Sequence, residues 1–129
     1  MELVVVIVLA GILSALAIPR FTNTESSATW YSEQVKAAVR YAQRQAVAQR
    51  RNVYVCIAVT SVSLTYDAAC STALAQPGTS APYSLPAPSG ASLAATTFSF
   101  NSLGQPSSAQ SLNIAGHAIT VEAETGYVH

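Results

Sequence analysis

Residues able to support acid–base or nucleophilic chemistry are few in this chain and lie far apart in the sequence. The two histidines are His117, in an expected strand or turn, and His129, the last residue. Neither stands in a known catalytic spacing with Asp67, Glu122 or Glu124. No Gly-x-Ser-x-Gly, phosphate-binding glycine loop or His-Glu-x-x-His motif occurs. The sequence therefore predicts a protein that is not an enzyme, with no catalytic residue and no cofactor.

Two cysteines, Cys56 and Cys70, offer the next possible chemistry. They form neither a Cys-x-x-Cys pair nor a zinc-type Cys/His cluster, so no metal site is predicted. Two cysteines fourteen positions apart, in a chain with a hydrophobic leader, fit one structural disulfide in an oxidising compartment. The alternative is a pair of unrelated buried thiols.

A basic stripe is the third candidate. Lys36, Arg40 and Arg44 are four residues apart and would share one helix face, with Arg51 nearby. Such a stripe could contact DNA phosphates. The alternative, which we favour, is a solvated or subunit-facing side of an amphipathic helix. The formal net charge is zero, and beyond residue 20 five basic residues balance five acidic ones, so no excess positive field favours nucleic acid.

The elements that must position these residues begin with a charge-free run, Leu3 to Ile18. As a helix it would be about 24 Å long, slightly shorter than the ~30 Å hydrocarbon core of a bilayer. It could be a membrane helix lacking a few residues at its start, a signal peptide, or a buried core helix. Ala15-Leu16-Ala17 resembles a cleavage site, but signal peptides begin with basic residues and this chain begins Met1-Glu2. A core helix should carry a polar stripe, which this run lacks.

A second helix is predicted over about residues 24–51. Small or apolar residues recur at intervals of three and four and so form one face of this helix, and charged and polar residues form the opposite face. These recurring positions are Val35, Ala38, Val39, Ala42 and Ala46. This amphipathic pattern predicts a helix that packs on a sheet.

The remaining residues predict an antiparallel sheet over about residues 53–128. A hairpin is expected from Val53–Val59 and Val62–Tyr66, and further strands from Thr96–Phe100, Ser111–Ala115 and His117–Ala123. Between the second and third of these strands, residues 72–94 are rich in proline and glycine, which predicts a long exposed loop. The chain of 129 residues is expected to form one domain, and only 9% of its residues are charged, which suits packing against copies of itself.

The residues from Glu2 to Phe21 carry a resemblance to a known family. An acidic residue opens the apolar run, a glycine lies within it, and it ends Ala17-Ile18-Pro19-Arg20-Phe21. This segment resembles the amino-terminal segment of type IV pilins and type II secretion pseudopilins. Family members carry a short basic leader ending in glycine, and then usually Phe-Thr-Leu-Ile, before the glutamate. Here only Met1 precedes Glu2. The resemblance therefore does not extend to the family's leader cleavage and amino-terminal methylation.

Four residues of this segment are candidates for subunit assembly. By the resemblance, Glu2 would neutralise the amino terminus of a neighbouring subunit and so set the axial step of a filament. Gly11 and Ala15, four residues apart, form a small-xxx-small patch that allows close helix packing. Pro19 removes a backbone donor and should kink or break the helix. The resemblance also implies that Gly11 to Pro19 loses helical order in assembled filaments.

A looser resemblance covers the rest of the chain. It is to H-type minor pseudopilins, related fimbrial minor pilins and the minor pilins of mannose-sensitive haemagglutinin pili. The segments concerned are Tyr41–Val53, Phe98–Asn101, Gly104–Pro106, Ile119–Val121 and Gly126–Val128. These segments favour a minor over a major subunit.

Residues and resemblance together predict an α+β, type IV pilin-like fold. Residues 1–20 would form a hydrophobic membrane or filament-core helix, and residues 21–129 a globular pilin domain with its helix packed on an antiparallel sheet. The implied function is structural, in a type IV pilus or a type II secretion pseudopilus. The alternatives are a DNA-binding minor pilin of an uptake pilus and a secreted soluble binding domain cut after Ala17.

The expected partners follow from that assignment. They are the inner membrane before assembly, other pilins in a homo- or hetero-oligomeric filament, and the assembly machinery. The globular domain would be periplasmic first, then on an extracellular or periplasmic filament, and would carry any adhesive specificity.

Overall fold

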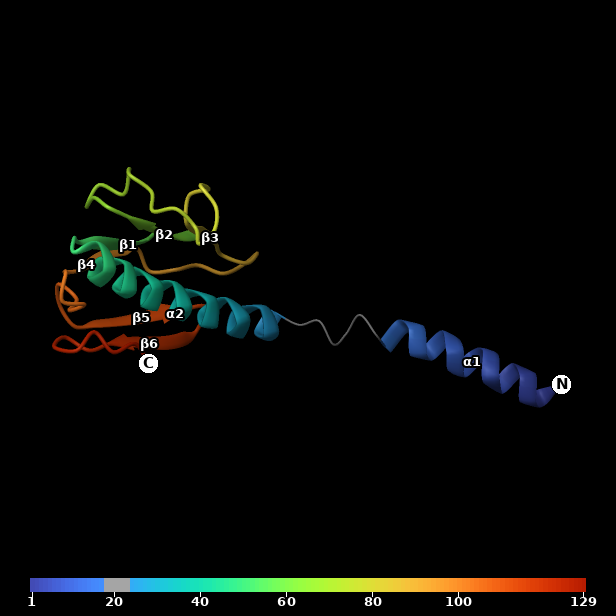
Figure 1. Ribbon diagram of the computed structural model, residues 1–129. Helices are drawn as coiled ribbons and strands as arrows, with labels where there is room; N and C mark the ends of the chain where they lie inside the picture. The colour runs from blue at the N-terminus through green and yellow to red at the C-terminus, as the bar shows by residue number, and fades with distance from the viewer. Residues whose placement is uncertain (18–23) are drawn as a thin grey trace.

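The computed structural model describes residues 1–17 and 24–129, and it shows two helices and six strands (Figure 1). The helices are α1 (Glu2–Ala17) and α2 (Thr24–Gln49). The strands are β1 (Val53–Ile57), β2 (Ser61–Thr65), β3 (Ser84–Pro86), β4 (Thr96–Phe100), β5 (Gln110–Ile114) and β6 (His117–Val121). The predicted α+β class with antiparallel strands is confirmed.

The second helix, α2, supplies one wall of the core. All five positions predicted for its apolar stripe are fully buried, and Tyr31 extends the buried stripe toward the start of the helix. The helix ends two residues earlier than predicted because Arg50 adopts a left-handed conformation with φ 53°. The Arg51 amide then donates to the Ala46 carbonyl at 3.2 Å, which satisfies one of the last helical carbonyls.

Four strands form one sheet in the order β3-β2-β1-β4, with all neighbours antiparallel. The β1–β2 hairpin forms as predicted, and Val55 of β1 lies opposite Leu64 of β2 and Phe98 of β4. These three side chains are buried. Because side chains alternate along each strand, they form one apolar row in the shared core.

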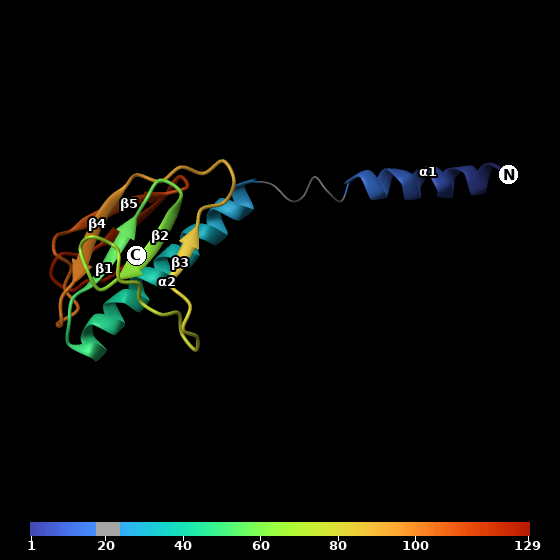
Figure 2. The same ribbon diagram turned by 90° about the horizontal axis from the view of Figure 1, so that it is seen from above.

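The last two strands form a separate sheet, so the strands do not make a single sheet. A two-residue turn joins β5 to β6, and both of its residues have positive φ, Ala115 at 52° and Gly116 at 86°. Such a turn matches the twist of the strands it joins. Figures 1 and 2 show α2 lying across both sheets, so that one helix covers both.

The proline-rich segment 72–94 is mostly exposed, as the sequence predicted, but it is not loop throughout. Ser84–Pro86 pairs with β2 as the edge strand β3, and Leu74 and Leu93 are buried in the core. The Tyr31 hydroxyl donates to the Leu85 carbonyl at 2.8 Å and so ties β3 to α2. Burial raises the pKa of Tyr31, and the phenol therefore stays protonated as the donor at neutral pH. Proline is tolerated here because β3 lies at the sheet edge.

Gln43 of α2 forms hydrogen bonds with two loops, one after β4 and one after β6. Its Nε2 donates to the Gly104 carbonyl at 2.8 Å and to the Thr125 carbonyl at 3.2 Å. A Cβ at Gly126 would lie 2.1 Å from the Gly104 oxygen and 2.4 Å from Gln43 Nε2, and φ at Gly126 is 69°. Only glycine therefore fits at position 126, both for its backbone angle and for the close approach.

We expect Gly126→Ala to lower the free energy of unfolding much more than Gly78→Ala. Gly78 also has positive φ, at 76°, but a Cβ there would meet nothing within 4 Å. Gly78→Ala should therefore cost only the left-handed strain of about 1–2 kcal/mol. Gly126→Ala should cost a further ~1–3 kcal/mol from overpacking. Urea unfolding of both variants measures the difference, and equal costs would contradict the close packing.

The predicted disulfide between Cys56 and Cys70 is present, with the two Cα atoms 6.2 Å apart. Asp67 organises the loop before Cys70. Its carboxylate accepts hydrogen bonds from the Ser71 hydroxyl, from the Thr72 amide at 2.9 Å and from the Ser71 amide at 3.0 Å. The Ser71 hydroxyl first, and then the Thr72 amide, hold the pKa of Asp67 below its usual range. The loop is therefore tied both covalently and by an ionised carboxylate.

Reduction of the disulfide should destabilise the protein by about 3 kcal/mol, from the loop-closure entropy of a loop of this size. Urea unfolding with and without reductant measures the change. The double variant Cys56→Ser with Cys70→Ser is the control, since its unfolding midpoint should be low and independent of reductant. A wild-type midpoint that does not move on complete reduction would show that the bond does not stabilise the fold.

Candidate assembly helix

α1 is an apolar helix exposed around its whole circumference. Nine large aliphatic side chains between Leu3 and Leu13 are each at least 54% exposed, and they point in every direction around the axis. They are Leu3, Val4, Val5, Val6, Ile7, Val8, Leu9, Ile12 and Leu13. A contiguous apolar surface of this kind marks a contact with lipid or with other protein. Within the described residues, no helix is both long enough and apolar enough for a membrane crossing, and α1 has 16 residues.

The few polar groups of α1 suit apolar surroundings. Ser14 Oγ donates to the Ala10 carbonyl at 2.8 Å, so its hydroxyl needs no outside partner. Glu2 lies in the first turn, where a carboxylate interacts favourably with the helix dipole. In the part of the chain that the structure describes, no ion pair involves Glu2.

Of the other three predicted assembly residues, the structure describes Gly11 and Ala15. A Cβ added at Gly11 would meet nothing within 4 Å, so no contact inside the described chain requires glycine there. Ala15 belongs to α1, and Pro19 lies outside the described residues. Gly11 and Ala15 thus belong to one helix four residues apart, as the sequence predicted, and no contact within the described residues depends on Gly11.

Two members of the basic stripe make contacts inside the chain. Lys36 Nζ lies 3.1 Å from the Glu33 carboxylate, an exposed pair one helical turn apart. Arg40 Nη2 donates to the Val128 carbonyl at 2.9 Å, and so holds the C-terminal segment against α2. One nitrogen of the Arg40 guanidinium is therefore engaged within the chain.

The other two basic residues differ from each other. Arg51 follows the end of α2, and its guanidinium lies 4.0 Å from the ring centre of Tyr66, a cation–π contact. Arg44 is exposed on α2. The structure thus gives three of the four basic residues contacts within the chain, which weakens the case for a DNA-binding stripe.

The histidines are not assembled with acids and nucleophiles into a reactive site. His117 Nε2 lies 3.3 Å from the Thr29 hydroxyl, and His129 Nε2 lies 2.9 Å from the Glu122 carboxylate. Both arrangements are exposed. Among residues 1–17 and 24–129, no three His, Cys, Asp or Glu side chains are grouped to hold a metal ion.

Sequence reasoning missed the roles of Gln43 and Trp30. Gln43 is one of the polar residues outside the apolar stripe of α2, yet it donates hydrogen bonds to the carbonyls of Gly104 and Thr125. The sequence pointed to these loops only through the segments Gly104–Pro106 and Gly126–Val128, which resemble those of minor pseudopilins. Trp30 is 65% exposed near the start of α2, and only the structure shows that its ring is left out of the core.

The comparison with known families matches the body formed by α2 and the strands. The family described as type II transport protein GspH matches residues 32–126, which include most of α2 and all six described strands. No curated protein and no solved structure is significantly similar to the chain. The match confirms the resemblance to the H-type minor pseudopilins, and the chain belongs to the family of type II transport protein GspH.

Proposed function

We propose that this chain is a structural, non-enzymatic subunit of a type II secretion pseudopilus. In this proposal α1 packs among the apolar helices of other subunits, and the body formed by α2 and β1–β6 lies outside that bundle. The division between the two parts falls near residue 20. The family supports membership of a type II secretion system, and the exposed apolar α1 supports a role in assembly.

The observation that carries the proposal is the uncovered surface of α1. Each fully buried Val, Leu or Ile contributes about 1.5–3 kcal/mol relative to exposure, and α1 presents nine such side chains at least half exposed. Nothing in the body has a comparable surface, because its large aliphatic residues are mostly in the core. Association through α1 is therefore the strongest contact available to the chain.

Before assembly, we propose, α1 is held in the inner membrane with the body in the periplasm. At 16 residues, α1 is about 6 Å shorter than the hydrocarbon core. A short helix can be accommodated by local thinning of the bilayer and by polar flanking groups that reach the interface. The disulfide fits a periplasmic body, because such bonds persist in oxidising compartments.

Glu2 would act when α1 leaves the lipid. A carboxylate in an apolar bundle needs a positive partner, and the free amino terminus of a neighbouring subunit would supply one. An ion pair in low dielectric depends strongly on geometry, so it would penalise wrong registers more than it would add stability.

We expect Val8→Asp to reduce incorporation into the filament fraction more than tenfold. A charge at the middle of an apolar helix costs about 2.5–3.5 kcal/mol in an apolar medium. The measurement is the share of antibody signal in the high-molecular-mass fraction of the native host. Val8→Leu is the matched control and should assemble normally. Because Val8 lies outside the core, thermal unfolding of the body should be the same in both variants, and normal assembly of Val8→Asp would refute the proposal.

Glu2→Gln tests the proposed ion pair separately. The amide keeps the size of the side chain and removes its charge, so we expect slower assembly with unchanged membrane association. Time-resolved incorporation after induction measures the rate, and membrane flotation measures association. Equal assembly rates for Glu2→Gln and the wild type would show that the carboxylate simply rests at the membrane interface.

A further inference from the structure

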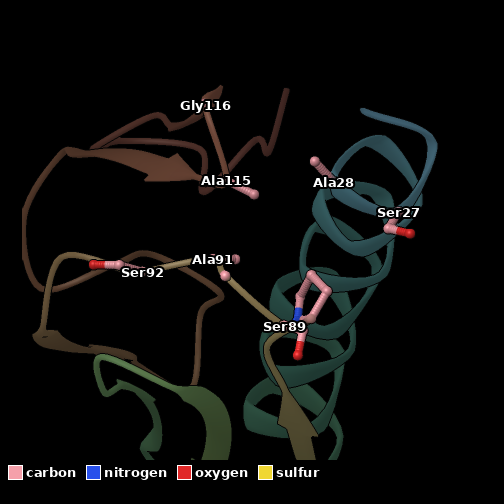
Figure 3. A pocket seen from close by; sticks show the side chains of 9 residues that line it. Ser27, Ala28, Ser89, Ala91, Ser92, Ala115 and Gly116 are labelled. Carbon is pink, nitrogen blue, oxygen red and sulfur yellow. The ribbon is translucent and has the colours of Figure 1, made fainter. Parts of the chain in front are cut away.

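A surface cleft beside the start of α2 carries no side chain that titrates near neutral pH or binds a metal ion. The cleft, of about 590 Å³, lies between α2 and the β5–β6 turn, and Figure 3 shows Ala28 and Ala115 on opposite sides of its opening. Every residue that lines it is a serine, alanine, glycine or proline. A reactive group that the proposed function does not use lies elsewhere in the body, in the disulfide between Cys56 and Cys70.

The two sulfur atoms of this disulfide differ in their access to solvent. Cys56 lies in β1, an interior strand of its sheet, and is only 6% exposed. Its neighbours along the strand, Val55 and Ile57, belong to the core, so Cys56 points to the opposite face of the sheet. There its Sγ lies 3.4 Å from the Oγ1 of Thr65, which is also buried. Cys70, in contrast, lies in an exposed turn after β2.

The residues around Cys70 leave its sulfur open. Ala68, Ala69 and Ser71 are small and exposed, so the turn places no bulky side chain beside the cysteine. On the sheet, the Oγ1 of Thr97 lies 3.9 Å from Cys70 Sγ, and this contact is exposed as well. The rate of thiol–disulfide exchange depends on direct access of the attacking thiolate to one sulfur atom. A thiolate from solvent can therefore reach Cys70, whereas Cys56 is covered.

Asp67 holds the turn that carries Cys70. Its carbonyl accepts a hydrogen bond from the Cys70 amide at 3.2 Å. Its carboxylate accepts bonds from the hydroxyl and the amide of Ser71 and, at 2.9 Å, from the amide of the next residue. The Thr65 hydroxyl donates to the same Asp67 carbonyl at 2.9 Å and lies beside Cys56 Sγ. One residue thus binds the backbone at and after Cys70 and is linked to the side chain next to Cys56.

The conformation of Cys70 depends on these hydrogen bonds. Its φ is 60°, in the left-handed region that residues other than glycine rarely adopt. Such a conformation persists only where the surrounding contacts hold it. The Ser71 hydroxyl first, and then the Thr72 amide, keep the pKa of Asp67 low, so its carboxylate is ionised at the neutral pH at which thiols exchange. Because none of these bonds requires the disulfide, the reduced chain should keep Cys70 close to Cys56, which favours closure.

We propose that thiol–disulfide exchange enters this bond through Cys70, and that Asp67 is the residue that positions Cys70 for closure. In oxidation, the Cys70 thiol loses its proton and the thiolate attacks a small disulfide such as glutathione disulfide. A mixed disulfide forms, and one glutathione leaves as a thiolate and takes up a proton. The Cys56 thiol then loses its proton and attacks the Cys70 sulfur, which closes the bond and expels the second glutathione. Two cysteines are oxidised and one glutathione disulfide is reduced to two thiols. Reduction follows the same steps in reverse, so a thiolate attacks Cys70 and expels Cys56.

The first test locates the mixed disulfide in the wild-type chain. The oxidised full-length chain in detergent is treated with reduced glutathione and quenched with acid, and mass spectrometry of the peptides finds the cysteine that carries glutathione. We expect at least tenfold more glutathione on Cys70 than on Cys56, and loss of this preference in urea that unfolds the chain. A preference for Cys56 in the folded chain, or no preference, would overturn the proposal.

Two single-cysteine variants give the same comparison without depending on a short-lived intermediate. Cys56→Ser and Cys70→Ser both lack the disulfide, so each is the matched control of the other. We expect folded Cys56→Ser to capture glutathione from glutathione disulfide at least tenfold faster than folded Cys70→Ser, and both to react at similar rates in urea. Similar rates in the two folded variants would contradict entry through Cys70.

Asp67→Asn tests the positioning of Cys70. The matched control is Glu124→Gln, which removes the same charge from an exposed carboxylate outside the disulfide loop. Reduced chains are oxidised with glutathione disulfide and quenched at intervals. We expect the Cys70–glutathione intermediate of Asp67→Asn to close at least fivefold more slowly than that of the control, while the first capture is no slower and still falls on Cys70. General unfolding would instead bring capture at Cys56 to the level of Cys70. Closure of Asp67→Asn at the control rate would refute the role of Asp67.

Discussion

The packing of α2 against two separate sheets is the contact on which the body depends. The sheets are not joined into one, and the buried stripe of α2 supplies the apolar surface that both share. Three alanines in that stripe, Ala38, Ala42 and Ala46, are fully buried. Their small size lets the helix axis lie close to the strands, so larger side chains from the sheets fill the space between. The core is therefore organised around one helix instead of one sheet.

The two helices differ in where their apolar residues find cover. In α2, the apolar stripe faces the sheets and most of the remaining surface is polar, so most of the apolar surface of the helix is covered within its own chain. In α1, no such stripe exists and every direction is apolar. The chain thus combines a helix whose apolar stripe is covered by its own strands with a helix whose apolar side chains are exposed. That difference, more than any single residue, separates a structural subunit from a free soluble domain.

Much of the fold could be predicted from the sequence because periodicity reports burial directly. The stripe of α2, the β1–β2 hairpin and the Gly116 turn follow local rules that tertiary structure did not override. β3 was missed because Pro86 and the prolines on either side of the strand signal a loop, and only pairing with β2 makes residues 84–86 an edge strand. The left-handed Arg50 was missed because glycine usually fills that role. Of the candidate site, the apolar helix could be predicted because its run carries no charge, whereas the contacts of Arg40 and Gln43 join segments far apart in the sequence that no local pattern connects.

The length of α2 has a mechanical consequence. It has 26 residues and contacts β1, β2, β4, β5 and β6 along its course. A pulling force that enters at its amino-terminal end acts along the helix axis and loads these contacts in shear. Contacts loaded in this way share the force and must fail together, whereas contacts peeled from one end fail singly. Displacing α2 along its axis would therefore require its contacts with all five strands to break together.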